Sequence, residues 1–150
     1  MKSTLLLGTR KGFVAYHFQN GKWQAENLSF EGIPVSIAYA DPRTGAWWAC
    51  LDHGHWGVKL HRSKDRGVTW DEVTAPAYPE GAEIKEGVPA TTRYIWAMAH
   101  GGQEYPSRLW IGTDPGGLFL SEDAGNSFQL VESLWNHPTR KDGWFGGGRD

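Results

Sequence analysis

Short runs of alternating apolar and polar residues, separated by turns rich in glycine, proline and aspartate, follow one another along the chain. Residues 58–63 read Val-Lys-Leu-His-Arg-Ser, for example. A period of two places successive side chains on opposite faces of a β-strand. With the turns as boundaries, the pattern predicts eleven strands, over residues 4–8, 13–18, 22–27, 35–40, 47–51, 58–63, 69–73, 94–99, 109–113, 118–121 and 127–131.

The composition agrees with a fold of short strands. The 150 residues include 20 Gly, 8 Pro and 9 Trp, whereas long helices favour Ala, Leu, Glu and Lys. This length corresponds to one domain. We therefore expect a single all-β domain with buried aromatic side chains, among them the tryptophans of the predicted strands, Trp47, Trp48, Trp96 and Trp110.

The charge balance and the single cysteine exclude several classes of protein. There are 15 basic and 17 acidic residues, a formal net charge of −2, with no block of like charge. Nucleic acid and anionic membranes attract a basic face, so we expect neither as the main partner. Cys50 cannot form an internal disulfide, which excludes a small secreted scaffold held by disulfides. The apolar run 5–7 is too short for a signal peptide or a membrane span, so we expect a soluble, cytoplasmic protein.

One motif occurs twice in the same register, 58 residues apart. Its pattern is Ser-x-Asp-x-Gly-x-(Ser/Thr)-(Trp/Phe), and each copy joins two predicted strands. Glycine adopts positive φ without steric cost, serine and aspartate bond to amides inside a turn, and the aromatic residue packs under the turn. The repetition indicates a repeated structural unit. The first copy comprises Ser63, Asp65, Gly67, Thr69 and Trp70, and the second Ser121, Asp123, Gly125, Ser127 and Phe128.

These two motifs resemble the Asp box, or BNR repeat, of sialidase-like β-propellers. The first copy fits that family's pattern at every position, whereas the second has Ser127 in place of threonine and Phe128 in place of tryptophan. A strand turn over 8–13 parallels the one over 112–118, so the resemblance extends over nearly the whole chain. It implies a β-propeller, in which each blade is a four-stranded antiparallel sheet running outward from a central channel.

The resemblance further implies an incomplete amino-terminal part of a larger propeller. The run 1–30 lacks an innermost strand like the small apolar runs 35–40 and 94–99. A closed ring takes about four to eight blades, so the remaining blades would come from sequence beyond residue 150 or, alternatively, from self-association. We expect an incomplete blade over 1–30, a blade over 31–75 with its Asp box at 63–70, an inter-blade loop over 76–93, a blade over 94–134 with its Asp box at 121–128, and the start of the next connection over 135–150.

Loops on one face of the predicted blades gather polar and aromatic residues. Turns alternate between the two faces of an antiparallel blade, which places the loops 9–12, 52–57, 75–93, 113–117 and 135–150 opposite the Asp boxes. Long loops in a compact domain are often functional. Polar groups around an aromatic wall suit a carbohydrate or a small anionic ligand. The candidate ligand-binding residues are Arg10, Asp52, His53, His55, Trp56, Arg93, Asp114 and His137, with Arg140 nearby in sequence.

His53 and His55 suggest a second hypothesis, a divalent metal. In an extended segment a spacing of two puts both imidazoles on one side, where they could bind the same metal ion. Asp52 or His137 would be a further ligand. Two histidines make only half of a zinc site. The alternative is that both imidazoles hydrogen-bond to neighbouring loops beside a packed Trp56. A metal is the one cofactor that the sequence suggests.

These patterns are compatible with three classes of function: a sialidase-like glycosidase, a metal-dependent hydrolase and a non-catalytic propeller. The sequence assigns no catalytic residues. Sialidases use a tyrosine nucleophile, and the family binds the substrate carboxylate through three arginines, the first in a Phe-Arg-Ile-Pro motif. Residues 30–34 read Phe-Glu-Gly-Ile-Pro, without that arginine.

A closer resemblance is to bacterial propellers often labelled exo-α-sialidase or glycosyl hydrolase. They begin with a Gly-Thr-Arg-Lys-Gly-(Leu/Phe) turn, which residues 8–13 match, and carry an Asp-His-Gly-His-aromatic-Gly loop, which residues 52–57 match. The competing classes are a metal-dependent hydrolase using His53 and His55, and a non-catalytic propeller. The latter would bind a glycan or a protein, similar in principle to assembly-factor propellers with Asp boxes.

Overall fold

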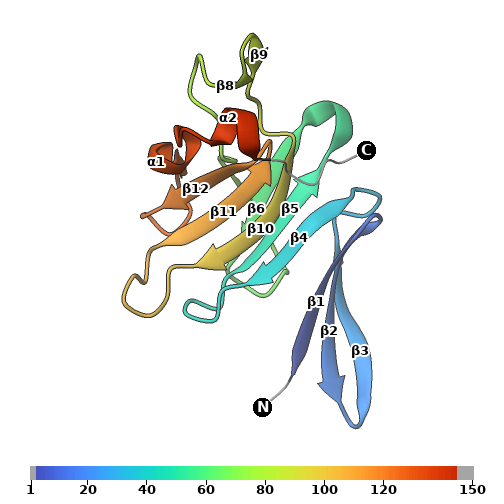
Figure 1. The fold of residues 1–150 in the computed structure, drawn as a ribbon. Coiled ribbons are helices and arrows are strands. Elements are labelled where there is room, and N and C mark those ends of the chain that lie inside the picture. Colours follow the sequence, from blue (N-terminus) through green and yellow to red (C-terminus); the bar gives the residue numbers. More distant parts are fainter. Residues whose placement is uncertain (1–2, 145–150) are drawn as a thin grey trace. The chain divides into compact units, whose positions relative to one another are not determined.

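The computed structural model describes residues 3–144, in which nearly all regular structure is antiparallel β-sheet (Figure 1). There are sheets of three, four and four strands and one two-stranded hairpin, and strand order follows chain order in each. The chain divides into two compact units, Met1–Thr74 and Ala75–Asp150. In the described residues, no helix has the length and apolar character needed to cross a membrane.

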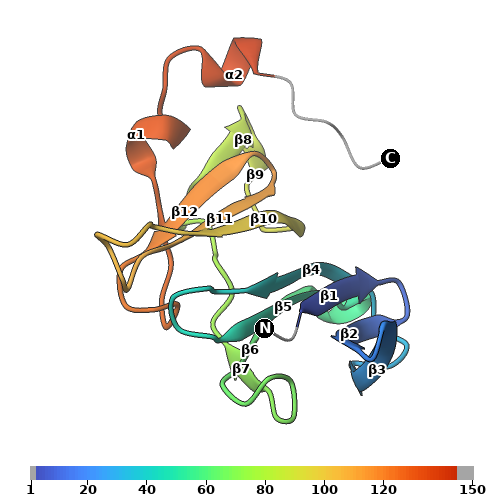
Figure 2. The same ribbon diagram turned by 90° about the horizontal axis from the view of Figure 1, so that it is seen from below.

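The first unit begins with the three-stranded sheet. Its strands are β1 (Thr4–Thr9), β2 (Gly12–Gln19) and β3 (Lys22–Ser29), with tight turns between them. The register pairs Thr9 with Gly12 across the first turn and Gln19 with Lys22 across the second. Figures 1 and 2 both show β1 beside β4 (Val35–Ala40), the first strand of the next sheet.

The four-stranded sheet of the first unit continues from β4 with β5 (Trp47–Asp52), β6 (Val58–Ser63) and β7 (Asp71–Val73). Residues 47–51 are an uninterrupted apolar run, and all five are buried, as expected of a central strand covered on both faces. Trp47 packs with Phe13 and Val35 in the core between the two sheets. The ring of Trp70 stands edge-on to Phe13 at 5.0 Å, and its indole N–H donates to Ser29 Oγ at 3.1 Å.

The second unit is built on one four-stranded sheet. Its strands are β10 (Tyr94–His100), β11 (Leu109–Asp114), β12 (Gly117–Ser121) and β13 (Gln129–Leu130). Alternate residues Leu109, Ile111 and Thr113 of β11 are buried, which is the period of two that the sequence shows. The unit also contains the hairpin β8 (Glu83–Lys85) and β9 (Val88–Pro89), and the short helices α1 (Glu132–Trp135) and α2 (Arg140–Gly143).

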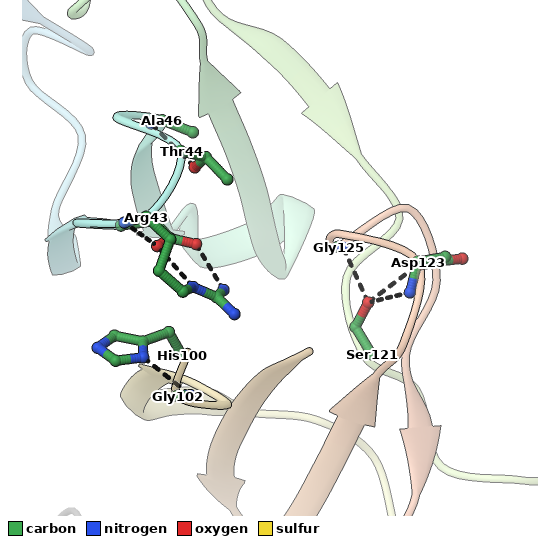
Figure 3. A network of polar contacts seen from close by, with 9 residues as sticks. Arg43, Thr44, Ala46, His100, Gly102, Ser121, Asp123 and Gly125 are labelled. Atoms are coloured by element: carbon green, nitrogen blue, oxygen red, sulfur yellow. Dashed lines mark hydrogen bonds and ion pairs between the residues drawn. The ribbon is translucent and has the colours of Figure 1, made fainter. Parts of the chain in front are cut away.

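The two repeated motifs form turns of the same geometry, which we call the first Asp turn (residues 63–70) and the second Asp turn (residues 121–128). In each, the buried serine hydroxyl donates to the aspartate at 2.8 Å and accepts from the buried glycine N–H, at 2.7 Å in the first turn and 2.8 Å in the second. Figure 3 shows these bonds in the second Asp turn. The aspartate then accepts from the backbone N–H of Thr69 or Ser127 at 2.9 Å and from its hydroxyl at 2.6 Å. Both glycines have a φ of 84°. The sequence repeat is therefore a structural repeat.

Each of the eleven predicted strands overlaps an observed one, with two systematic differences at the Asp turns. Strands were predicted to restart at residues 69 and 127, but β7 begins at Asp71 and β13 at Gln129. The aspartate carboxylate captures the N–H groups of Thr69 and Ser127, and a captured N–H cannot join a strand ladder.

Three other expectations for the fold are corrected. The segment 76–93, predicted as a loop, contains the hairpin β8–β9. The connection after residue 131 contains α1 and α2 in place of irregular loop. Trp96, predicted in the core with Trp47 and Trp48, is 47% exposed because it points away from the buried face that its neighbour Ile95 occupies.

Candidate functional site

The loop between β5 and β6 is the most distinctive surface feature of the first unit. Its backbone closes on itself, because His53 N–H donates to Gly57 O at 3.1 Å and Gly57 N–H donates to Gly54 O at 3.0 Å. Residues Gly54–Trp56 form one turn of 3-10 helix, begun by Gly54 at a φ of 59°. The extended geometry assumed for the metal hypothesis is therefore wrong, and the spacing of two no longer aligns His53 and His55.

This closed loop presents Trp56 to solvent. The side chain is 70% exposed, and the ring of His55 stands edge-on to it at 5.5 Å. The expectation of a packed Trp56 is thus also wrong. The indole N–H donates to none of the described residues. A large exposed indole on a closed turn is typical of a contact residue in a binding site.

A cleft of about 330 Å³ lies beside this tryptophan, within the first unit. Part of its floor comes from the 30–33 segment, which is held in place by backbone hydrogen bonds from Gly32 N–H to Lys11 O at 3.1 Å and from Ile33 N–H to Phe30 O at 3.0 Å. A further bond, from Asp52 N–H to Pro34 O at 2.9 Å, ties this segment to the end of β5. The lining residues are Phe30, Ile33, Leu51, His53, Trp56, Lys59, His61 and Glu72.

The charged groups of the cleft are paired with one another. Lys59 Nζ lies 2.7 Å from one carboxylate oxygen of Glu72, and His61 Nε2 lies 3.9 Å from the other. The hydrogen bond from Lys59 lowers the pKa of Glu72. Burial lowers the pKa of His61, whose ring packs on Phe30 at 4.8 Å. The cleft therefore combines an apolar floor with a locally neutralised rim.

Lys59, His61 and Glu72 were missed as site residues, although the sequence holds a signal for them. Lys59 and His61 are two apart on β6 and so share one face of the sheet. His61 pairs across the ladder with Glu72 on β7. What the sequence could not supply is the position of the 30–33 segment, which reaches this face only through tertiary contacts.

In the second unit, Arg93 and Asp114 are neighbours at one end of the sheet. Arg93 N–H donates to the carbonyl of Asp114 at 2.7 Å, and Arg93 Nε lies 3.2 Å from Asp114 Oδ2. The Arg93 side chain is 61% exposed, so this guanidinium is accessible to a ligand.

Tyr78 anchors the 75–93 segment to the same end of the sheet. Its hydroxyl lies 2.8 Å from Thr113 Oγ1 and donates to Pro115 O at 2.5 Å, and burial raises its pKa. Its ring packs on Phe119 and Trp135, with centroids at 5.1 and 4.8 Å. The predicted face thus brings loop 113–117 and segment 75–93 together within this unit.

Arg140 has a structural task. It is buried, its guanidinium lies 3.6 Å over the ring of Trp135, and it donates to the backbone carbonyls of Glu83 at 3.1 Å and Ile84 at 3.2 Å. A further bond goes to the carbonyl of Trp135. All of these acceptors are backbone oxygens, so Arg140 connects β8 to the segment that contains α1 and α2.

The remaining candidates stand apart from these clusters. Arg10 is exposed on the turn between β1 and β2, next to Lys11, which bonds to the 30–33 segment. His137 lies 2.9 Å from Thr139 Oγ1 and stacks on Trp144 at 5.5 Å. Of the predicted loop 135–150, residues 145–150 lie outside the described part. Within residues 3–144, no three His, Cys, Asp or Glu side chains come together as a metal site would require.

No protein-family model and no curated protein matches this sequence. The chain is similar to a solved structure of YCF48 bound to D1 peptide, with a TM-score of 0.51 and 10% identity over 87% of this chain and 42% of that chain. YCF48 is a β-propeller protein. The four-stranded sheets described above are β-propeller blades. A second similar structure, YCF48 from Cyanidioschyzon merolae, has a TM-score of 0.44 and 12% identity over 92% of this chain and 42% of that one.

The fold class predicted from the sequence, all-β with propeller blades, is confirmed. The chain spans about two fifths of the length of the solved structures that it resembles. At 10% identity the likeness is one of fold, and residue roles do not transfer through it.

Proposed function

We propose that this chain is a propeller scaffold that binds a peptide segment of a protein partner at the cleft beside the 52–57 loop. The observation that carries the proposal is Trp56, 70% exposed on a closed turn at the rim of an apolar cleft. An exposed aromatic anchor beside a pocket is the usual centre of a protein-binding site.

Two arguments favour a peptide over a carbohydrate. Sugar hydroxyls require many polar groups, whereas Phe30, Ile33 and Leu51 make the floor of this cleft apolar. In addition, one propeller of similar fold is known with a peptide bound, as its description "YCF48 bound to D1 peptide" states. The candidate residues Asp52, His53, His55 and Trp56 belong to this proposed site, and Arg10 lies on a neighbouring turn. For the second unit we propose a contribution from Arg93, Asp114 and His137.

A finer assignment, to the sialidase-like Asp-box or BNR propellers, is supported by the two Asp turns. Their serine, aspartate and glycine make the same hydrogen bonds in both copies. We propose blades over 1–30, 31–75 and 94–134, of which the last two each contain one of these turns. Such turns define an architecture, and architecture does not imply glycosidase chemistry. Glycosyl hydrolysis is therefore the second candidate.

The proposal is tested with the full chain on an array of diverse peptides and on a glycan array. We expect wild-type protein to bind a subset of the peptides, Trp56→Ala to lose that binding, and Trp23→Ala to keep it. Trp23 is a matched control because it is an exposed tryptophan, at 49%, on β3. Binding to glycans but to no peptide would contradict the proposal. Turnover of a fluorogenic sialoside would favour the hydrolase instead.

A further inference from the structure

The chemistry of the cleft beside Trp56 restricts the kind of peptide that it can accept. Three properties matter: the charges of the rim, the free hydrogen-bonding groups, and the shape and polarity of the floor. Each is considered within the first unit, and together they rest on the proposed function of peptide binding.

The rim charges do not call for a charged ligand. Lys59 and Glu72 form an ion pair at 2.7 Å, and His61 lies on the other side of the same carboxylate. Burial lowers the pKa of His61, which favours its neutral form. The two opposite charges of this pair balance, so the rim offers no net attraction to a ligand charge of either sign. The occupant is therefore expected to be neutral where it contacts the cleft.

One free hydrogen-bonding group at the mouth, the indole N–H of Trp56, is a donor. The indole N–H of Trp56 contacts no acceptor among residues 3–144, and the side chain is 70% exposed. A bound segment should offer it a carbonyl oxygen. An extended segment without internal hydrogen bonds keeps its carbonyls available for this purpose, as the polyproline II helix does.

The floor is apolar and aromatic. Phe30, Ile33 and Leu51 line it, and Trp56 and His53 stand at its edge. Proline rings pack against aromatic side chains, and a proline-rich segment is already extended before binding, so it loses little conformational entropy. The cleft is also open to the surface and about 330 Å³ in volume, large enough for one or two such rings.

We propose that the occupant of this cleft is a neutral, proline-rich segment in the polyproline II conformation, with a backbone carbonyl accepting a hydrogen bond from Trp56. The proline rings lie on the floor formed by Phe30 and Ile33. The Lys59–Glu72 pair remains intact in the complex.

The test measures fluorescence polarisation of a labelled, uncharged peptide of about ten residues, rich in proline and containing leucine. A second peptide has alanine in place of every proline. We expect the proline peptide to bind the full chain, and Trp56→Ala to weaken that binding about tenfold or more, as loss of a central aromatic anchor does. Trp56→Phe, which keeps a ring but lacks the N–H, should bind with intermediate affinity. Trp23→Ala should bind like the wild type, and added salt should leave the affinity unchanged.

The outcomes separate this inference from the proposed function. If the alanine peptide binds through Trp56 as tightly as the proline peptide, or if salt weakens binding steeply, the inference is overturned while peptide binding stands. If the proline peptide does not bind but other array peptides bind through Trp56, the inference is likewise overturned and the proposed peptide binding stands. If no peptide binds, both proposals are overturned. Thermal unfolding verifies that each variant is folded. Because Trp56 is exposed, we expect its substitution to leave folding unaffected.

Discussion

The hydroxyl of Thr69 donates to the Asp65 carboxylate at 2.6 Å, while the backbone N–H of the same threonine donates to the other carboxylate oxygen at 2.9 Å. One aspartate thus holds both polar groups of a residue four positions further on. Ser127 and Asp123 repeat this relationship with the same two distances. Serine can replace threonine here because only the hydroxyl is used.

Ser63→Ala should destabilise the first unit by about 1–3 kcal/mol, because it leaves the buried Gly67 N–H without an acceptor. Urea unfolding measures the change. Ser133→Ala is the control, since Ser133 is exposed on α1, and it should change the free energy of unfolding by less than about 0.5 kcal/mol. Equal effects of the two substitutions would contradict the role given to Ser63.

The Asp turns should make stability depend on acid pH. Hydrogen bonds from Thr69 and Ser63 lower the pKa of Asp65 from 3.8 to about 2, and the corresponding bonds lower the pKa of Asp123. A carboxylate with a depressed folded-state pKa stabilises the fold above its unfolded pKa, and this contribution disappears as the pH falls through the folded pKa. We therefore expect a loss of stability between about pH 4 and pH 2.

The double variant Asp65→Asn and Asp123→Asn isolates that contribution. The asparagines do not titrate, so the free energy of unfolding of the variant should fall less steeply than that of the wild type over the same interval. Urea titrations at several pH values give both slopes. Identical slopes would mean that other carboxylates govern acid unfolding.

Gly67→Ala should destabilise more than Gly45→Ala. Both glycines have positive φ, 84° and 74°, which costs an alanine about 1–2 kcal/mol. A Cβ at Gly45 would meet nothing within 4 Å, whereas one at Gly67 would lie 3.2 Å from the ring of Trp47. We expect a further destabilisation of about 1–3 kcal/mol from this crowding. Chemical denaturation of the two variants side by side measures the difference in their free energies of unfolding. Equal destabilisation by the two substitutions would show that the Trp47 ring can move aside without an energetic cost.

Arg140→Lys should behave almost like Arg140→Ala. The planar guanidinium reaches three backbone carbonyls at once, which a single ammonium cannot do. Both variants should lose about 2–3 kcal/mol, because a buried charge-assisted network is broken, and should exchange amide hydrogens faster in β8–β9. Arg93→Ala is the matched control, since its ion pair is exposed and worth about 0–1 kcal/mol. Full rescue by lysine would contradict the proposed geometry.

Most strands were predictable because their signals are local. Alternation along 109–113 reflects one covered and one less covered face, and the observed strands contain this run and the run 58–63. The Asp turns were predictable for the same reason, because the hydrogen bonds among their serine, aspartate, glycine and threonine or serine lie within eight residues. The hairpin β8–β9 was missed since each strand is very short, although Gly87 with a φ of 72° marks its turn.

The candidate site was predictable only in part. The loop 52–57 was identified from its histidines and tryptophan, but its conformation was not, because Gly54 turns the chain into a 3-10 helix in place of an extended segment. Arg140 was grouped with ligand-binding residues since an arginine after a long loop has no local signal for burial. Two of its three carbonyl partners lie more than fifty positions earlier in the chain.

The amino-acid sequence by itself determined the strands, the two matching turns and the all-β blades, because each depends on residues that are neighbours along the chain. Only the tertiary structure decided that Phe30, His61 and Glu72 surround one cleft next to Trp56. These residues come from different segments, and packing of the 30–33 segment against the sheet joins them. Such contacts depend on the three-dimensional path of the backbone, which no local pattern records.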